Sequence, residues 1–562
     1  MMTNSPTSDQ SASPKFWGGR FVHWFDQRPR LLRFVDWFFV LYVFAAYVAM
    51  PIPEVNEPHY LAKAKHYWNP TWCAGDQFLE STDAHQVFCW TMGWLTLFLP
   101  LKTVACLGRI VVLLLQSWSW QKLSHAIFPR VHALYTAILL VIISDNTQIA
   151  SEWILGGVEA KGFAFALLFL ALEALVHKKW NRVWLFLGGA TAFHVLVGGW
   201  SAIVCAGIWV CSGRERPSLK SMWTGLCGFT ILAAPSVWFG LKLSFGVDPA
   251  VVAEAQRIQY IERIPHHLNP FAFIKTTVNV TQLALFVAGV AAFSFYPSFS
   301  HRTFPRREKV KVVVWFMVGS AVIALAGLLI ALATQSSPNL AAGILRFYWF
   351  RLFDVALPIG VAFVGFAFLS KWKSAAITIV LLCLPIGYWL RYSYRDYIAT
   401  VPRADNFVAD EQDWQAACAW ASSKTEPTDL FLTPAQVGTF KMYANRPEVA
   451  TRKDMPQDPT SVVEWWRRML KIHRAPEDDP NDPTSGPTDR WRLSLGTLGN
   501  ERLRSLADEY HAKYVIVVKE WQVLDHSKPP VKIPLPLLDF PLVYTNPHYA
   551  IYRFSSDQPA AK

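Results

Sequence analysis

Five carboxylates lie within about thirty residues of one another in a polar segment that follows the first apolar run of the chain. They are Glu54, Glu57, Asp76, Glu80 and Asp83, with His59 and His85 among them. Such carboxylates can accept a proton from a hydroxyl group, or they can hold a divalent cation that binds phosphate. Solvation alone also accounts for an acidic loop, so both interpretations remain open at this point.

A second acidic segment runs from Asp145 to Glu159. Glu152 and Glu159 are seven residues apart, so they would share one face of a helix. Further along, His194 stands alone in an apolar run. A lone histidine there is either a packing residue or a ligand.

Two arginines, Arg346 and Arg351, occur among four aromatic residues at the start of a late apolar run. Arginine is costly within a membrane unless it is paired or faces a polar cavity, and its guanidinium matches phosphate geometry. Five positions along a helix correspond to about 140° of rotation between the two side chains. We therefore expect one arginine to face a cavity and the other to pair, with Asp354 as the expected partner of Arg351.

The composition shows what kind of protein must position these residues. Of the 562 residues, 52% are hydrophobic and 17% are charged, with 26 Trp and 38 Phe. Soluble globular proteins carry nearer to ~25% charged residues. The mean hydropathy of +0.22 likewise favours a multi-pass membrane protein over a soluble enzyme, a disordered chain or a fibre. The net charge of +12 does not indicate nucleic-acid binding, because no basic stretch is long enough to form a binding face.

The apolar runs predict a polytopic α-helical membrane protein with about 11–12 transmembrane or half-crossing helices. They span about 34–52, 85–100, 103–119, 131–144, 160–176, 183–211, 221–245, 277–297, 311–334, 341–369 and 373–391. The 183–211 run could form two helices that break near Gly198-Gly199.

Basic residues between these runs predict the orientation, because positive loops normally remain inside. They put residues 1–33 in the cytoplasm, residues 34–391 in the transmembrane domain and the acidic loop 53–84 outside, in an inner or plasma membrane. One run between residues 85 and 144 cannot cross fully, because an even number of crossings must separate two outside loops.

Residues 392–562 have the composition of a soluble domain, which we expect to be an extracytoplasmic α/β domain. Trp414, Ala417, Cys418 and Ala421 recur at helical spacing. A helix near residues 503–510, with Asn500 as its N-cap, should precede a buried parallel strand at 514–518. Residues 542–545 and 550–554 are typical of a hairpin, and 475–489 are rich enough in proline and acid to predict a loop.

The arrangement resembles the GT-C superfamily, integral-membrane glycosyltransferases that use sugars linked to polyprenyl phosphate. The resemblance rests on the short basic N-terminus, one span, the element Glu57-Pro58-His59-Tyr60, the second acidic segment, the late arginines and the C-terminal domain. Short elements of that domain, such as Leu432-Thr433-Pro434, are also similar to this group. Two departures are that Asn56 precedes Glu57, and that Glu464-Trp465-Trp466-Arg467 lacks the aspartate of the oligosaccharyltransferase motif. Transfer to asparagine is therefore not implied.

The resemblance implies an inverting transfer from a polyprenyl-phosphate donor at the extracytoplasmic face, with membrane lipid as a partner. It makes Glu57 the general base, with Asp76 and Asp83 as alternatives for the base or for ligands of a divalent cation such as Mg or Mn. Substrate would be held by Arg346, Arg351, His59, Glu152, Glu159 and His194.

Two other functions remain open from the sequence. A transporter or flippase of an anionic lipid or solute would use intramembrane charged residues as a path. Its candidates are Arg346, Asp354, Glu173, Lys242 and His194. A non-catalytic GT-C-like scaffold that binds a lipid-linked glycan is the other alternative.

Overall fold

The computed structural model describes residues 29–128, 133–273, 277–294, 304–369, 410–474, 494–519 and 538–554, with a few positions between 383 and 394. Within these residues, four helices are long and apolar enough to cross a membrane: Leu101–Ile127, Leu219–Lys242, Arg307–Ala333 and Arg351–Phe368. Shorter apolar helices span Ala133–Asn146, Val195–Cys211 and Val278–Ser294. The prediction of a polytopic α-helical membrane protein is confirmed.

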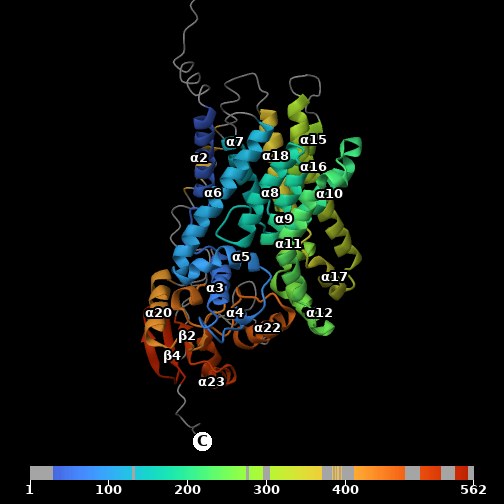
Figure 1. The fold of residues 1–562 in the computed structure, drawn as a ribbon. Coiled ribbons are helices and arrows are strands. Elements are labelled where there is room, and N and C mark those ends of the chain that lie inside the picture. The colour runs from blue at the N-terminus through green and yellow to red at the C-terminus, as the bar shows by residue number, and fades with distance from the viewer. Residues whose placement is uncertain are drawn as a thin grey trace, which may run out of the picture.

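The long helices lie roughly side by side in one bundle (Figure 1). It contains α2 (Pro29–Tyr47), α6 (Leu101–Ile127), α7 (Ala133–Asn146), α8 (Ala160–Val176), α9 (Trp180–Phe193), α10 (Val195–Cys211), α11 (Trp223–Lys242), α15 (Thr277–Ser294), α16 (Phe304–Ala333) and α18 (Arg351–Leu369). Helix α8 packs against α6 and α9, and its largely buried side chains form the centre of the bundle. The core there is aromatic, with Trp120 in contact with Phe169 and Phe363.

The apolar run at 85–100 is too short to cross the membrane. It forms only α5 (Gln86–Thr91) and the 3₁₀ turn η1 (Gly93–Leu97), whereas a crossing needs about 20 residues. The run packs instead on α3 (Glu57–Trp68), where Trp68 Nε1 donates to the Cys89 carbonyl at 2.8 Å. Among the apolar runs between 85 and 144, this one therefore forms the shortest helices, in agreement with the expectation that one of them does not cross fully.

The 183–211 run does form two helices, but the break lies at His194 rather than at Gly198-Gly199. His194 separates α9 from α10, and its Nδ1 accepts a hydrogen bond from the Val197 amide at 3.3 Å. Gly198 lies within α10, where an added Cβ would come 2.2 Å from the Thr191 backbone nitrogen. The glycine therefore permits close packing of two helices and does not end one.

Short helices lie at the end of the bundle nearest the C-terminal region (Figure 1). They are α3, α4 (Gln77–Glu80), α5, α12 (Pro249–Arg257), the π-turn η4 (Ile258–Arg263), α13 (Pro265–Leu268), α14 (Pro270–Phe273) and α17 (Pro338–Leu345).

The C-terminal region is a small mixed sheet covered by helices, in agreement with the predicted α/β class. The strands β1 (Phe431–Leu432), β2 (Tyr514–Val518), β3 (Leu542–Thr545) and β4 (Tyr549–Arg553) have the order β1-β2-β4-β3. Strand β2 is fully buried and pairs parallel to β1 and antiparallel to β4, while β3 and β4 form the expected hairpin.

The predicted helix of this region is α20 (Glu411–Lys424), which buries Trp414, Ala417, Cys418 and Ala421. The other helices are α21 (Phe440–Ala444), α22 (Pro459–His473) and α23 (Gly499–Tyr510). Asn500 lies inside α23 and bonds Asp539, so it is not the N-cap. The predicted loop 475–489 and most of the run 373–391 lie outside the described residues.

Candidate functional site

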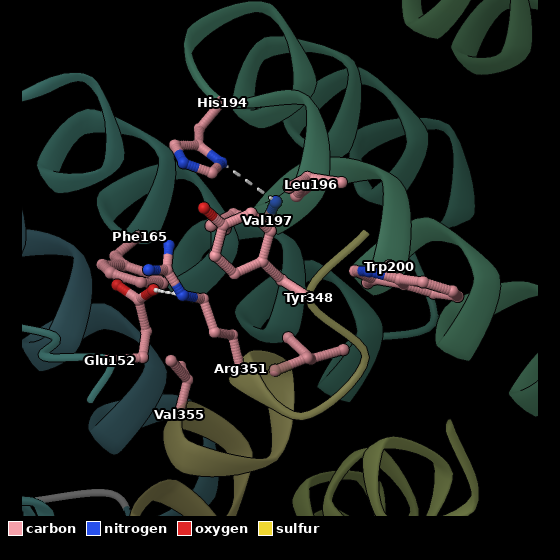
Figure 2. Close-up of a pocket in the computed structure, with 10 residues that line it drawn as sticks. Glu152, Phe165, His194, Leu196, Val197, Trp200, Tyr348, Arg351 and Val355 are labelled. Atoms are coloured by element: carbon pink, nitrogen blue, oxygen red, sulfur yellow. Dashed lines mark hydrogen bonds and ion pairs between the residues drawn. The ribbon is translucent and has the colours of Figure 1, made fainter. Parts of the chain in front are cut away.

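A narrow pocket lies where α10, α18 and the segment before α8 meet (Figure 2). Its walls are Glu152, Phe165, His194, Leu196, Val197, Trp200, Tyr348, Arg351, Leu352 and Val355. It encloses about 20 Å³, which is enough for about one water molecule. Three of the predicted substrate-binding residues, Glu152, His194 and Arg351, therefore line one pocket.

The Glu152 carboxylate and the Arg351 guanidinium are the charged groups of this pocket. Arg351 Nε lies 3.2 Å from Glu152 Oε2, and the guanidinium lies over the Tyr348 ring at 3.9 Å. Arg351 Nε and Glu152 Oε1 are both buried, and each has an ionic contact: Arg351 Nε with Glu152 Oε2, and Glu152 Oε1 with Lys161 Nζ at 2.8 Å. A guanidinium has five N–H donors, so at a pocket wall it is suited to an anionic ligand.

The segment that carries Glu152 is held by Asp354 of α18. The Asp354 carboxylate accepts from the amides of Ile149, Ala150 and Glu152, and from Gln282 Nε2 at 2.9 Å. Asp354 therefore does not pair with Arg351, and that expectation is wrong. Its carboxylate positions the loop, and the loop positions the partner of Arg351.

Two residues beside the charged pair have left-handed backbone conformations. They are Ser151 (φ 54°) and Tyr348 (φ 55°). This region is unfavourable for residues other than glycine, and such strain is concentrated at functional sites. At Tyr348 it lets the chain turn between α17 and α18, which directs the ring into the pocket between His194 and Arg351 (Figure 2).

Arg346 differs from Arg351 in its surroundings. Within the described residues it pairs with no carboxylate; its guanidinium lies 5.0 Å from the centre of the Phe347 ring. Burial lowers the pKa of Arg346. It does not line the pocket around Glu152. The two arginines do not share a helix, because Arg346 caps the end of α17 and Arg351 begins α18. Arg351 both lines the pocket and pairs, so the expected division of roles between the two arginines is wrong.

The residues of the transporter alternative do not gather in one path. Glu173 pairs with His177 at the far end of α8, and Asp354 is held by backbone amides. Lys242 lies in the last turn of α11. Of that set, only His194 lines the pocket.

Glu159 lies in a second cluster of charged residues adjacent to the pocket. Its Oε2 accepts from Asn56 Nδ2 at 2.9 Å, and its Oε1 accepts from Trp153 Nε1 at 3.0 Å. Lys161 Nζ bridges Glu159 and Glu152, at 3.4 Å and 2.8 Å. Burial raises the pKa of Glu159, and Lys161 opposes that rise.

Glu57 is fully buried at the start of α3, and its carboxylate has four donors. Arg109 Nε and Nη2 approach it at 3.1 and 2.8 Å, and the amides of Glu54 and Val158 donate to it at 2.7 and 2.9 Å. Glu54 in turn accepts from the Gly157 amide. Glu57 therefore joins loop 53–84 to the segment that precedes α8. A proton acceptor needs a free lone pair directed at the substrate, so these contacts favour an anchoring role for Glu57.

Asp83 is connected to the pocket residue His194 through His85. The His85 amide and ring Nδ1 both contact Asp83 Oδ1, at 2.7 and 3.0 Å, while Gln457 Nε2 lies 2.8 Å from the same Nδ1. Burial tends to raise the pKa of Asp83, but the hydrogen bonds from His85 lower it overall. His85 Nε2 lies 3.5 Å from the Tyr60 hydroxyl, and its ring centre lies 5.7 Å from that of His194. In the tautomer with Nδ1–H directed at Asp83, Nε2 of His85 is the basic nitrogen. The Gln457 amide can only donate through its own Nε2, so in that tautomer it does not hydrogen-bond Nδ1.

Asp76 and His59 belong to a buried cluster, the Lys441 cluster, that joins loop 53–84 to the C-terminal region. Lys441 Nζ lies 3.2 Å from Asp76, 2.6 Å from Glu448 and 2.6 Å from Asp454. His59 Nδ1 contacts Asp454 at 3.1 Å. Burial alone would lower the pKa of Lys441, but the three carboxylates raise it well above its usual value. Burial also raises the pKa of Glu448 to about 7, with Lys441 opposing.

The predicted metal ligands do not fit a divalent cation. Such an ion takes six or more oxygen ligands in open geometry. Here Glu57 is neutralised by Arg109 and Asp76 by Lys441, while Asp83 is engaged by His85. Two ion pairs and one hydrogen-bonded Asp83–His85 pair, each in a separate place, offer no shared set of oxygen donors.

One further grouping of possible ligand residues was not predicted from any sequence pattern. Within the described residues, Asp410, Asp413 and His548 place one ligand atom each within 4.8 Å of one another. Asp413 and His548 already pair at 2.6 Å, across 135 residues. None of the three lines the pocket at Arg351.

The stability of the protein should depend on pH through Lys453, which reaches Asn56 beside Glu159. Burial, reinforced by Arg263, lowers the pKa of Lys453 from 10.5 to about 8. Between these values the unfolded chain binds the proton more strongly, so unfolding becomes less favourable as pH rises. The melting temperature of the wild type relative to Lys453→Met should therefore increase from pH 8 to 10.5 and remain constant below pH 8. A flat difference across that window would contradict the assignment.

The fold and site define a helical membrane protein with a charged pocket at the end of the bundle nearest the C-terminal region. Residues 412–472 match a family described as a domain of unknown function (DUF6798). None of the curated proteins matches the chain. Among solved structures, the chain is similar to an archaeal oligosaccharyltransferase, AglB from Archaeoglobus fulgidus, in complex with an inhibitory peptide and a dolichol-phosphate. The TM-score is 0.42 at 12% identity, over 88% of this chain and 70% of that chain.

Proposed function

We propose that the protein is a membrane glycosyltransferase that moves a sugar from a polyprenyl-phosphate donor to an acceptor hydroxyl at the extracytoplasmic face. The observation that carries the proposal is the Glu152–Arg351 pair, which places a guanidinium at the pocket wall. The GT-C-like order of elements in the sequence supports the same reaction class.

In this reaction Arg351 binds the donor phosphate and stabilises the negative charge that develops as the sugar–phosphate bond breaks. A guanidinium suits this task because it donates two parallel hydrogen bonds to phosphate oxygens. Glu152 keeps the side chain in position. The pocket has space for about one water molecule, so a phosphate group enters only when the Tyr348 ring moves aside.

Asp83, acting through His85, serves as the general base. His85 removes the acceptor proton through Nε2 as the acceptor oxygen attacks the anomeric carbon from the face opposite the phosphate, which inverts that carbon. Tyr60 is next to this base: its hydroxyl lies 3.5 Å from His85 Nε2, and burial together with the charges of Glu159 and Asp83 raises its pKa.

The test is transfer from labelled polyprenyl-phosphate sugars in proteoliposomes. Arg351→Ala should lower the rate on the order of 10²–10³-fold, the usual loss for one charge-stabilising donor. Arg351→Lys should recover only part of that rate, because lysine keeps the charge without the paired donors. The exposed Arg182 offers the control Arg182→Lys, which should transfer at the wild-type rate.

Two outcomes would replace this proposal. In the first, folded wild-type protein binds a polyprenyl-phosphate sugar more tightly than Arg351→Ala does, but transfers the sugar to no acceptor. The protein is then a non-catalytic scaffold. If it moves the lipid across the bilayer without chemistry, it is a flippase. Equal donor binding by wild type and Arg351→Ala would exclude the phosphate role of Arg351.

A further inference from the structure

Lys161 has an unusual position at the beginning of a helix. It lies in the first turn of α8, two residues after the N-cap Glu159. A helix N-terminus carries partial positive charge, so a lysine there is unfavourable for the helix itself. Lys161 is nevertheless buried, with 6% of its surface exposed. Its position must therefore be stabilised by contacts beyond α8.

Those contacts are two carboxylates and an aromatic ring. Lys161 Nζ lies 2.8 Å from Glu152 Oε1, 3.4 Å from Glu159 Oε1 and 3.9 Å from the centre of the Trp153 ring. A cation that bridges two buried carboxylates next to a phosphate-binding pocket occupies the position that a divalent metal takes in many phosphate sites. Here the cation is part of the chain.

The charges around the pocket balance without any added ion. Glu152 and Glu159 supply two negative charges, and Lys161 and Arg351 supply two positive charges. Glu152 uses one oxygen for Lys161 and the other for Arg351. The Glu159 oxygens already accept from Asn56 and Trp153. A metal ion would have to displace Lys161 to reach either carboxylate.

We propose that Lys161 replaces a divalent cation in this site: its ammonium group fixes Glu152, Glu152 fixes Arg351, and donor phosphate is bound without a metal. The inference rests on the proposed function for the role of Arg351, but the cation site itself can be tested without any substrate. Lys161 is a positioning residue, since it acts through Glu152 and does not contact the pocket space.

The direct test is Mn²⁺ binding, followed by electron paramagnetic resonance of the free ion, on the full-length protein in nanodiscs. Any Mn²⁺ that the wild-type protein binds should also be bound by Glu152→Gln, because Glu152 is not part of a metal site in the wild type. Lys161→Met frees two adjacent carboxylates and should bind Mn²⁺ at least on the order of tenfold more tightly than wild type. The double variant Lys161→Met with Glu152→Gln should lose that site again. Lys179→Met, an exposed lysine beyond the other end of α8, is the matched control and should behave as wild type.

Activity gives a second readout. Wild-type transfer should be unchanged by EDTA, while Lys161→Met should transfer slowly and regain rate when Mn²⁺ is added. Because Lys161 positions Arg351 for the donor, the loss should raise KM for the donor at least as much as it lowers kcat. Lys161→Arg, which keeps a cation, should remain insensitive to Mn²⁺.

Three results would overturn the inference: wild-type transfer that EDTA abolishes, a wild-type Mn²⁺ site that depends on Glu152, or a folded Lys161→Met that binds Mn²⁺ no better than wild type. If Lys161→Met does not fold, Glu152→Gln in the wild-type background still decides the question through Mn²⁺ binding. A protein without transferase activity whose Lys161→Met variant gains Mn²⁺ would refute the proposed function and leave the cation replacement standing.

Discussion

Replacing Lys441 with Met should destabilise the protein more than any other single substitution of a lysine in the C-terminal region. Its ammonium group is the common partner of Asp76, Glu448 and Asp454, all nearly fully buried. Removing one partner of a buried ion pair costs about 3–5 kcal/mol, because the remaining charge is left buried. Here three carboxylates would lose their partner at once.

The measurement is the free energy of unfolding in detergent, combined with limited proteolysis. Lys441→Met should be cleaved readily in loop 53–84, which the Lys441 cluster joins to the C-terminal region. The matched control is Lys424→Met at the exposed end of α20, which should change stability by about 0.5 kcal/mol or less. Equal stability of the two variants would show that the Lys441 cluster contributes nothing to holding the loop.

Glu57→Gln should also cause a large loss of stability, again about 3–5 kcal/mol, because it leaves the Arg109 guanidinium buried without its carboxylate. The substitution separates two roles. If Glu57 is an anchoring residue, the Glu57→Gln protein loses stability, and its transfer rate per folded molecule stays within a few fold of the wild-type rate. If Glu57 is the general base, the transfer rate of Glu57→Gln falls by about 10²–10⁴-fold while the protein remains folded.

Thermal unfolding and transfer should therefore be measured on the same Glu57→Gln preparation. Glu80→Gln makes the identical change at an exposed carboxylate of the same loop and serves as the control for both readouts. A stable Glu57→Gln with abolished transfer would restore Glu57 as the base and remove that role from Asp83 and His85.

The helix positions were largely predictable because apolar length is a local property of the sequence. The differences arise where packing overrides it. Gly198 was expected to break a helix, but it lies against Thr191 in the interior of one. Residues 86–97 are apolar, yet they pack on α3 as short turns. In both places, contacts with another helix decided the conformation.

The acidic residues of the site could be identified from their clustering in the sequence, but their roles could not be inferred from it. Clustering suggested one negative field that would attract a metal. In the structure each of the three predicted ligands has a partner: Arg109 of α6 for Glu57 and Lys441 of α21 for Asp76, both from other elements, and the neighbouring His85 for Asp83. Ion pairs such as Glu57–Arg109 and Asp76–Lys441 join separate parts of the chain and have no characteristic spacing. Sequence patterns therefore reveal the carboxylates and not the cations that neutralise them.

The Lys441 cluster also has a consequence for the order in which the protein is made. His59 and Asp454, which contact each other in it, are separated by 395 residues. At 5–20 residues per second, ribosomal synthesis of that interval takes roughly 20–80 seconds. During this time the whole helical bundle can insert, while the carboxylate of Asp76 still lacks its lysine. Loop 53–84 therefore completes its structure as one of the last steps of biogenesis, only after the C-terminal region has emerged and reached the same side of the bundle.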